Sequence, residues 1–193
     1  IYETCRRYGI DITREPIPVV PAAHYFCGGV LVDEWGRTTV RNLFAAGEVA
    51  CTGLHGANRL ASTSLLEGLL WGHRAGSYIS ETVNESLDYD PARIPPWRGV
   101  KSREAVDPVL ISQDLLTIRT TMWNYVGIVR TEKRLQRAKA DLEYLSHRIE
   151  RFYYEMRLTR ELVELRNAML VARIVTNAAL QNRVSRGCHY RVD

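Results

Sequence analysis

The stretch TEKRLQRAKADLEYLSHRIERF, residues 131–152, decides the fold class because its apolar side chains recur at steps of three and four. This spacing places them on one face of an α-helix. The members of the stripe are Leu135, Ala138, Leu142, Leu145, Ile149 and Phe152. Thr131 precedes the stripe, and its hydroxyl can accept a hydrogen bond from the first free N–H groups of a helix. The stretch therefore predicts an amphipathic helix capped by Thr131.

Two further helices are expected on either side of this one. A second apolar stripe follows, and its members are Leu162, Leu165, Met169, Ala172, Val175 and Ala179. It opens near Thr159, with Glu161 in the first turn, where the helix dipole favours an acid. An earlier helix is expected over residues 112–125, ending before Val126 and Gly127. Three amphipathic helices with short connections predict an antiparallel three-helix bundle.

The formal net charge of +4 comes from a basic excess in the second half of the chain. There the basic residues alternate with acids at helical spacing, which indicates a solvated helix face and no nucleic-acid partner. No run of about 18 apolar residues occurs, so no membrane partner is expected either. The four cysteines show neither zinc-ligand spacing nor a disulfide framework, so they are expected to be reduced and no metal site is indicated.

The chain divides into two parts with different composition. Residues 1–81 contain many glycines and short β-branched runs, whereas the segment after residue 102 has few helix breakers. The stretch from Asp88 to Gly99 is rich in turn residues, which suits a linker. We therefore expect a mainly α chain: residues 1–86 form an α+β part with short strands and one helix, residues 87–101 a linker, and residues 102–193 the helical bundle.

A glycine pair, Gly28 and Gly29, opens the segment 28–38, which reads as a strand, a tight turn at residues 34–36 and a returning strand. Glycine lets the backbone approach a ligand closely because no Cβ intervenes. His24 stands just before this pair. On the pattern alone, His24 is either a structural histidine with satisfied hydrogen bonds or a ligand-binding residue.

The segment Leu43–Glu48 reads as a short apolar strand that ends in a glycine and an acid. A carboxylate at the end of such a strand can accept hydrogen bonds from the hydroxyls of a cofactor's sugar or polyol. The alternative for Glu48 is a surface or ion-paired residue.

The segment His55–Glu67 runs from a glycine-flanked loop into a helix. Ser64 and Glu67 have the spacing of a capping box, in which Glu67 would reach back to the start of the helix. The N–H groups near Ser64 and Leu65 would then point outward and favour an anion such as a reduced flavin. Arg59 offers a planar fork suited to a carboxylate. The alternative is an ordinary capped helix beside a surface arginine.

Four motifs together resemble the succinate dehydrogenase and fumarate reductase flavoprotein family. They are PAAHY at 21–25, GGV at 28–30, AAGE at 45–48 and GLHGANRLASTSLLE at 53–67. The tail SRGCH at 185–189 also resembles this family, so the likeness runs from end to end. Leu54, the alanines before His24 and the opening segment 1–17 resemble the members that oxidise L-aspartate to iminoaspartate, the first step of NAD biosynthesis.

The resemblance implies a role for each matching residue. His24 and Arg59 would bind the carboxylates of L-aspartate, or of fumarate as an alternative electron acceptor to O2. Glu48 would hold the ribityl chain of a noncovalent FAD, while Ser64 and Leu65 would contact the isoalloxazine through backbone groups. Thr63 stands where many members have Asn, a departure beside the flavin that bears on local hydrogen bonding.

The resemblance also implies that residues 1–86 are the C-terminal part of an FAD-binding domain and that part of the machinery lies elsewhere. No G-x-G-x-x-G occurs in the chain, so the loop that cradles the FAD pyrophosphate is expected upstream. The arginine that shuttles a proton is expected upstream as well, so no catalytic residue is assigned here and the FAD site is expected to be incomplete. Because the chain opens on Ile1, we expect it to be a piece of a longer cytoplasmic protein.

Two other functions remain open. One is a succinate dehydrogenase or fumarate reductase subunit, which uses the same flavin geometry on a dicarboxylate without an amine. The other is a helical interaction module, in which residues 102–193 dock onto a partner. Quinolinate synthase, which consumes the unstable imine, is the partner that the resemblance suggests.

Overall fold

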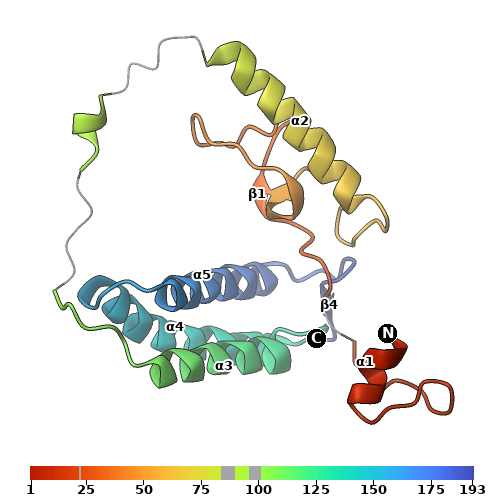
Figure 1. The fold of residues 1–193 in the computed structure, drawn as a ribbon. Helices are drawn as coiled ribbons and strands as arrows, with labels where there is room; N and C mark the ends of the chain where they lie inside the picture. Colours follow the sequence, from red (N-terminus) through yellow and green to blue (C-terminus); the bar gives the residue numbers. More distant parts are fainter. Residues whose placement is uncertain (22, 84–89, 96–100) are drawn as a thin grey trace.

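The computed structural model describes residues 1–21, 23–83, 90–95 and 101–193, and Figure 1 shows their arrangement. The described part is mainly helical, as expected. Residue 22 of the PAAHY motif lies outside the described residues, and so do residues 87–89 and 96–100 of the expected linker. Within the remainder of that stretch, η2 (Pro91–Arg93) is a single 3₁₀ turn.

Three long helices form the bundle: α3 (Pro108–Tyr125), α4 (Glu132–Glu155) and α5 (Arg160–Gln181). Each packs against the other two. The hydroxyls of Thr131 and Thr159 accept from N–H groups three residues ahead, which confirms the predicted starts of α4 and α5. Helix α3 begins before the expected residue 112, because Asp107 caps it and Pro108 occupies its first position.

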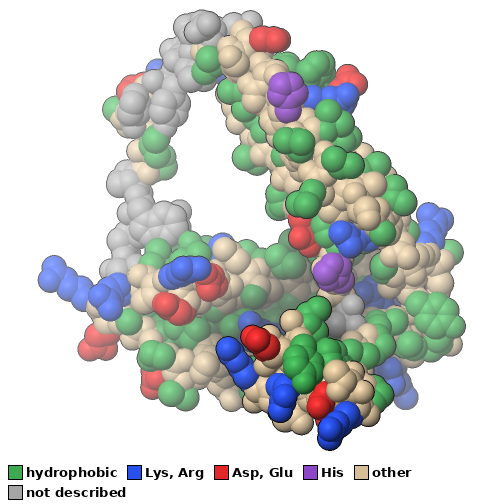
Figure 2. Space-filling view, turned by 45° about the vertical axis from the view of Figure 1, so that its right-hand side comes forward, with side chains coloured by type: hydrophobic (Ala, Val, Ile, Leu, Met, Phe, Trp, Pro, Cys, Tyr) green, Lys and Arg blue, Asp and Glu red, His purple; other side chains and the backbone are tan. Residues whose placement is uncertain are grey.

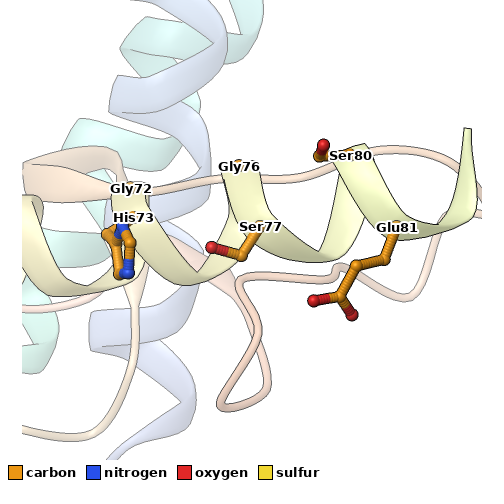
Figure 3. Close-up of a pocket in the computed structure, with 6 residues that line it drawn as sticks. All are labelled: Gly72, His73, Gly76, Ser77, Ser80 and Glu81. Atoms are coloured by element: carbon orange, nitrogen blue, oxygen red, sulfur yellow. The ribbon is translucent and has the colours of Figure 1, made fainter.

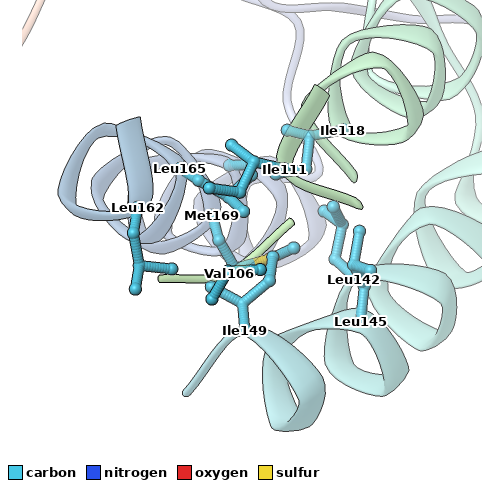
Figure 4. Close-up of a cluster of buried hydrophobic side chains, with 10 residues drawn as sticks. Val106, Ile111, Ile118, Leu142, Leu145, Ile149, Leu162, Leu165 and Met169 are labelled. Carbon is cyan, nitrogen blue, oxygen red and sulfur yellow. The ribbon is translucent and has the colours of Figure 1, made fainter. Parts of the chain in front are cut away.

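Both predicted apolar stripes face the bundle core. The side chains of Leu135, Leu142 and Ile149 on α4 are almost fully buried, and those of Leu162 and Leu165 on α5 are equally so. Figure 4 shows most of these side chains converging with residues of α3. Only the last member of the first stripe and one member of the second are partly exposed. Burial of these chains removes apolar surface from water at about 25 cal/mol per Å² and holds the bundle together.

The charged face of α4 is exposed, as its alternating pattern predicts. The Arg137 guanidinium lies 2.9 Å from the Asp141 carboxylate, and the Lys139 amine lies 3.8 Å from the Glu143 carboxylate. These pairs join successive turns of one helix, and their side chains are between 35% and 68% exposed. Each pair balances two opposite charges within the helix.

The end of the chain returns to the bundle as a short strand. β4 (Tyr190–Arg191) pairs in parallel with β3 (Val129–Arg130), which lies between α3 and α4. The Arg191 guanidinium is almost buried and binds the carboxylates of Glu132 and Asp193. We call residues 185–191 the tail, and these contacts hold it against the bundle.

The described residues of the first part of the chain contain two α-helices, one more than expected. Its elements are α1 (Tyr2–Arg7), β1 (Val30–Leu31), η1 (Gly47–Val49), β2 (Ala50–Cys51) and α2 (Ser64–Thr82). The expected hairpin over residues 28–38 is wrong: its turn forms, but β1 pairs in parallel with β2. The cause is the close approach of Gly29 to the Val49 carbonyl, where an added Cβ would lie 2.2 Å from the oxygen.

Helix α2 carries an apolar face that is open to solvent. Leu65, Leu66 and Leu69 are each mostly exposed, and Figure 2 shows hydrophobic side chains gathered along this helix. Farther along, Gly72 and Gly76 leave an open groove of about 480 Å³ beside His73 and Glu81 (Figure 3). In the part of the chain that the structure describes, no helix is both long and apolar enough to cross a membrane.

Candidate functional site

The start of α2 brings together residues from two of the sequence motifs. Arg59 lies in the loop before the helix and donates from Nε to the Ser64 hydroxyl at 2.9 Å. Its guanidinium also lies over the Tyr25 ring, 5.1 Å from the centroid. The loop reaches this position through a left-handed turn at Ser62, whose φ is 65°. The arginine is thus held on two sides, with its Nη groups available to pair with a carboxylate.

The predicted capping box is wrong. Glu67 does not reach back to the helix start, because its carboxylate is buried and accepts hydrogen bonds from three other side chains. The Thr52 hydroxyl is one donor, His55 Nε2 lies 2.9 Å away, and the Tyr25 hydroxyl lies 3.3 Å away. Burial raises the pKa of Tyr25, so its hydroxyl stays protonated and donates.

Because Glu67 is bonded elsewhere, the start of α2 lacks the predicted side-chain cap. Among the described residues, no side chain accepts from the first-turn N–H groups at the Thr63 cap. Leu65, in the first turn, is 90% exposed, so solvent reaches this end of the helix. Uncapped N–H groups and the positive end of the helix dipole favour an anion. The preference for an anion here therefore remains a prediction, although the expected cap does not form.

Glu48 lies beside the loop that carries His24. Its carboxylate accepts from the backbone N–H of Phe26 at 3.0 Å, and most of the side chain is exposed. The expected strand before Glu48 does not form: Phe44 makes one isolated bridge with Arg37, and Glu48 itself lies in the 3₁₀ helix η1. Gly47, at φ 77°, turns the chain there, and this turn replaces the strand end.

His24 is exposed at the edge of this site, directly before the Tyr25 that contacts Arg59. Thus the structure brings Arg59 and Ser64 into direct contact, and it places His24 and Glu48 on neighbouring segments. Leu65 lies at the open helix end. Across the described residues, no group of His, Cys, Asp and Glu side chains could hold a metal ion.

The tail of the bundle reaches the same loop. The backbone N–H of Cys188 donates to the Ala57 carbonyl at 3.0 Å, and its thiol donates to Asn58 Oδ1 at 3.1 Å. Burial and the neighbouring Cys188 raise the pKa of the Cys27 thiol, which favours the protonated form of Cys27. The tail motif that the sequence singled out therefore supports the loop that carries Arg59.

The sequence does not predict that four residues of this site form one connected group. They are Tyr25, Thr52, His55 and Glu67. Each lies in or beside a motif that the sequence flagged, but their joint contact depends on how distant segments fold together. A buried acid was the one available signal, because Glu67 falls among the leucines that open α2. The capping-box spacing between Ser64 and Glu67 instead predicted that this acid caps the helix.

The residues present fit a flavin. The open N-terminal end of α2 offers N–H groups to an anionic edge, and Glu48 offers a carboxylate to hydroxyl groups. Gly47, Gly53 and Gly56 have open space where a Cβ would lie, so a ligand can approach the backbone there. This donor and acceptor set matches a ring system with an attached polyol.

Comparison with protein families supports the same assignment. Residues 1–65 match the model described as "FAD binding domain", and residues 116–193 match the one described as "Fumarate reductase flavoprotein C-term". The whole chain superposes on the Escherichia coli quinol fumarate reductase with a TM-score of 0.84 and 31% identity, covering 35% of that chain. It superposes on a chain of the Mycobacterium smegmatis Sdh1 complex with a TM-score of 0.75 and 30% identity, covering 34% of it.

The fold and the open site at α2 define an FAD-binding flavoprotein, and the chain belongs to the succinate dehydrogenase and fumarate reductase flavoprotein family. Within it, the chain is similar to L-aspartate oxidases. All 193 residues align at 47% identity with the Pseudomonas aeruginosa enzyme, and the whole chain aligns at 42% with the chloroplastic enzyme of Arabidopsis thaliana. The chain spans 36% and 32% of the length of these two relatives.

Proposed function

We propose that this chain is part of a cytoplasmic FAD enzyme that oxidises L-aspartate to iminoaspartate, the first step of NAD biosynthesis. The observation that carries the proposal is the meeting of Arg59, Tyr25 and Ser64 at the open start of α2. A fixed guanidinium beside an anion-binding helix end is what a dicarboxylate and a flavin require of adjacent sites. The identity with L-aspartate oxidases over the whole chain supports the choice of substrate.

Each site residue has a chemical task in this proposal. Arg59 pairs with one substrate carboxylate through its Nη groups, while the bond from Nε to Ser64 keeps the fork from turning. His24, exposed on the adjacent loop, donates to the other carboxylate. Fixing both ends of the substrate orients its Cα toward the flavin. When bound, FAD supplies a two-electron acceptor for the hydride from Cα, and the electrons then leave to O2 or fumarate.

The chain also contributes to holding the noncovalent cofactor. Glu48 would accept hydrogen bonds from the ribityl hydroxyls, and the backbone groups of Ser64 and Leu65 would contact the isoalloxazine. Because no G-x-G-x-x-G occurs in the chain, the pyrophosphate contacts come from outside it, as does the proton-shuttling arginine. The exposed apolar face of α2 supports the proposal that residues 1–86 belong to a larger FAD-binding domain, joined by a linker at 87–101 to a helical domain at 102–193.

A succinate dehydrogenase or fumarate reductase subunit is the second candidate, and the TM-score of 0.84 with quinol fumarate reductase favours it. An anaerobic experiment separates the two. The complete flavoprotein, loaded with FAD, is mixed with L-aspartate or with succinate, and bleaching of the flavin absorbance is followed. Bleaching by aspartate alone supports the oxidase, whereas bleaching by succinate alone assigns the second candidate.

The exposed charged face of α4 supports a docking role for the bundle, with quinolinate synthase as the partner. Such docking would pass the unstable imine directly to the enzyme that consumes it. Reversing the charge at Arg134 and Arg137 should abolish pull-down of quinolinate synthase by the flavoprotein. Retained pull-down by this double variant would show that α4 is not the docking face.

A further inference from the structure

Glu67 occupies a position that the proposed reaction does not by itself explain. It lies in the first turn of α2 and is 3% exposed, yet it carries a carboxylate. Burying a charged group is costly unless it is hydrogen-bonded. Three donors meet that need: the hydroxyls of Thr52 and Tyr25 and the Nε2 of His55. Tyr25 comes from one segment of the chain, and Thr52 and His55 come from another, so the carboxylate joins segments that are separate in sequence.

The histidine in this group has a defined tautomer. His55 Nδ1 accepts the backbone N–H of Leu60 at 3.1 Å, so Nδ1 carries no proton. The proton therefore sits on Nε2 and is donated to Glu67 at 2.9 Å. Both ring nitrogens are used, and the ring also packs edge-on against Tyr25, with 4.9 Å between centroids. Because the His55 ring is bonded at both nitrogens, it links Glu67 to the backbone at Leu60.

The segment that carries His24 and the loop that carries Arg59 are both attached to the Glu67 carboxylate by hydrogen bonds. Tyr25 follows His24 directly, and Leu60 follows Arg59 directly. Glu67 holds Tyr25 by one hydrogen bond and Leu60 through His55 by two. The Tyr25 ring in turn packs against the Arg59 guanidinium.

We propose that Glu67 is a positioning residue that sets the separation of His24 and Arg59, and hence the fit of a dicarboxylate between them; this rests on the function proposed above. The Glu67 side chain is 1% exposed, so it acts through its hydrogen bonds and does not touch the substrate. Removing it frees both carboxylate-binding segments at once, while the open end of α2 and Glu48 remain in place for the flavin.

The test uses the complete flavoprotein loaded with FAD. Glu67→Ala removes every acceptor, whereas Glu67→Gln keeps an oxygen for Tyr25 and His55 and can donate its amide to Thr52. Asp114→Ala is the matched control, because Asp114 is also buried, at 2% exposure, but binds Arg148 inside the bundle. For Glu67→Ala we expect KM for L-aspartate to rise about tenfold or more and kcat to change less than about threefold. Glu67→Gln and Asp114→Ala should keep KM within about threefold of the parent.

A purely structural role for Glu67 predicts a different result. Glu67→Ala and Asp114→Ala would then lower the melting temperature alike and leave KM of the flavin-loaded fraction unchanged, which overturns the proposal. If Glu67→Ala does not fold, Tyr25→Phe removes a single donor, and an unchanged KM in that variant also counts against positioning.

A second readout does not depend on turnover. Amide hydrogen exchange of the peptide that contains Leu60 should speed up about tenfold or more in Glu67→Ala and stay unchanged in Asp114→Ala. If no dicarboxylate reduces the flavin of the parent protein, the proposed function fails, and the exchange data still decide whether Glu67 holds the loop. Equal exchange in both variants would overturn the positioning role even in an active enzyme.

Discussion

The Cys188 thiol donates a hydrogen bond to the Asn58 side chain at 3.1 Å, across 130 positions of sequence. A parallel backbone bond runs from the Cys188 N–H to the Ala57 carbonyl at 3.0 Å. Because Asn58 directly precedes Arg59, the tail of the helical part closes on the loop that presents the candidate substrate ligand. The two halves of the chain therefore share one site.

Replacing Gly187 with alanine should undock the tail from this loop. A Cβ at Gly187 would lie 2.1 Å from the Ala57 carbonyl oxygen, and the residue has a φ of 54°. We expect Gly187→Ala to lower the free energy of unfolding by about 1–3 kcal/mol, measured by urea denaturation of the complete flavoprotein. Val184→Ala, at an exposed position just before the tail, should change it by less than about 0.5 kcal/mol. Equal effects in both variants would contradict the docked tail.

The guanidinium of Arg59 should be needed for its shape as well as its charge. Arg59→Lys keeps the positive charge but loses the bond to Ser64 and the fork that matches a carboxylate. We expect KM for L-aspartate to rise about ten- to a hundredfold with flavin content unchanged. Steady-state kinetics of the flavin-loaded protein measure the change. A KM within about twofold of the parent would remove Arg59 from the substrate site.

Attachment of β4 should weaken in acid. Hydrogen bonds from Gln136 and from the Arg191 guanidinium lower the pKa of Glu132, so the folded protein favours the ionised form. The stability this gives is present above the unfolded pKa of about 4.5 and is lost as pH falls through the lower folded pKa. Hydrogen exchange of residues 185–191 should therefore accelerate in acid more steeply in the parent protein than in Glu132→Gln. Identical pH profiles would rule out the pair as the cause.

The cap of α4 should contribute measurably to the bundle. The Thr131 hydroxyl accepts from the Arg134 N–H at 3.2 Å, and Thr131→Ala leaves that donor without a side-chain acceptor. We expect a loss of about 1 kcal/mol in the free energy of unfolding, with Thr131→Ser recovering most of it. Urea denaturation followed by circular dichroism measures both variants. A loss in the serine variant as large as in alanine would assign the effect to the threonine methyl group.

The bundle could be predicted from the sequence because its signals are local. Thr131 and Thr159 stand directly before periodic stripes, and the same residues form the caps in the structure. The sequence pattern places the start of α3 at residue 112, which makes the predicted helix too short. Asp107 and Pro108 fix its true beginning.

For the candidate site, the sequence indicates which motifs contribute residues but not which hydrogen bonds connect them. Arg59 and Ser64 meet as expected of neighbours in one motif. Glu67 has the spacing of a capping residue, and only the folded chain offers it Thr52 and His55 as better partners. These partners lie in a loop outside the helix, so the periodicity of the helix sequence does not predict the contacts.

The docking of Cys188 on Asn58 also fixes an order of events during synthesis. The Arg59 loop leaves the ribosome early, but its support from the tail exists only after α3, α4 and α5 have been made. Contacts of such long sequence separation form late in folding. A nascent chain can thus hold a finished α2 while the Arg59 loop still lacks its support from the tail.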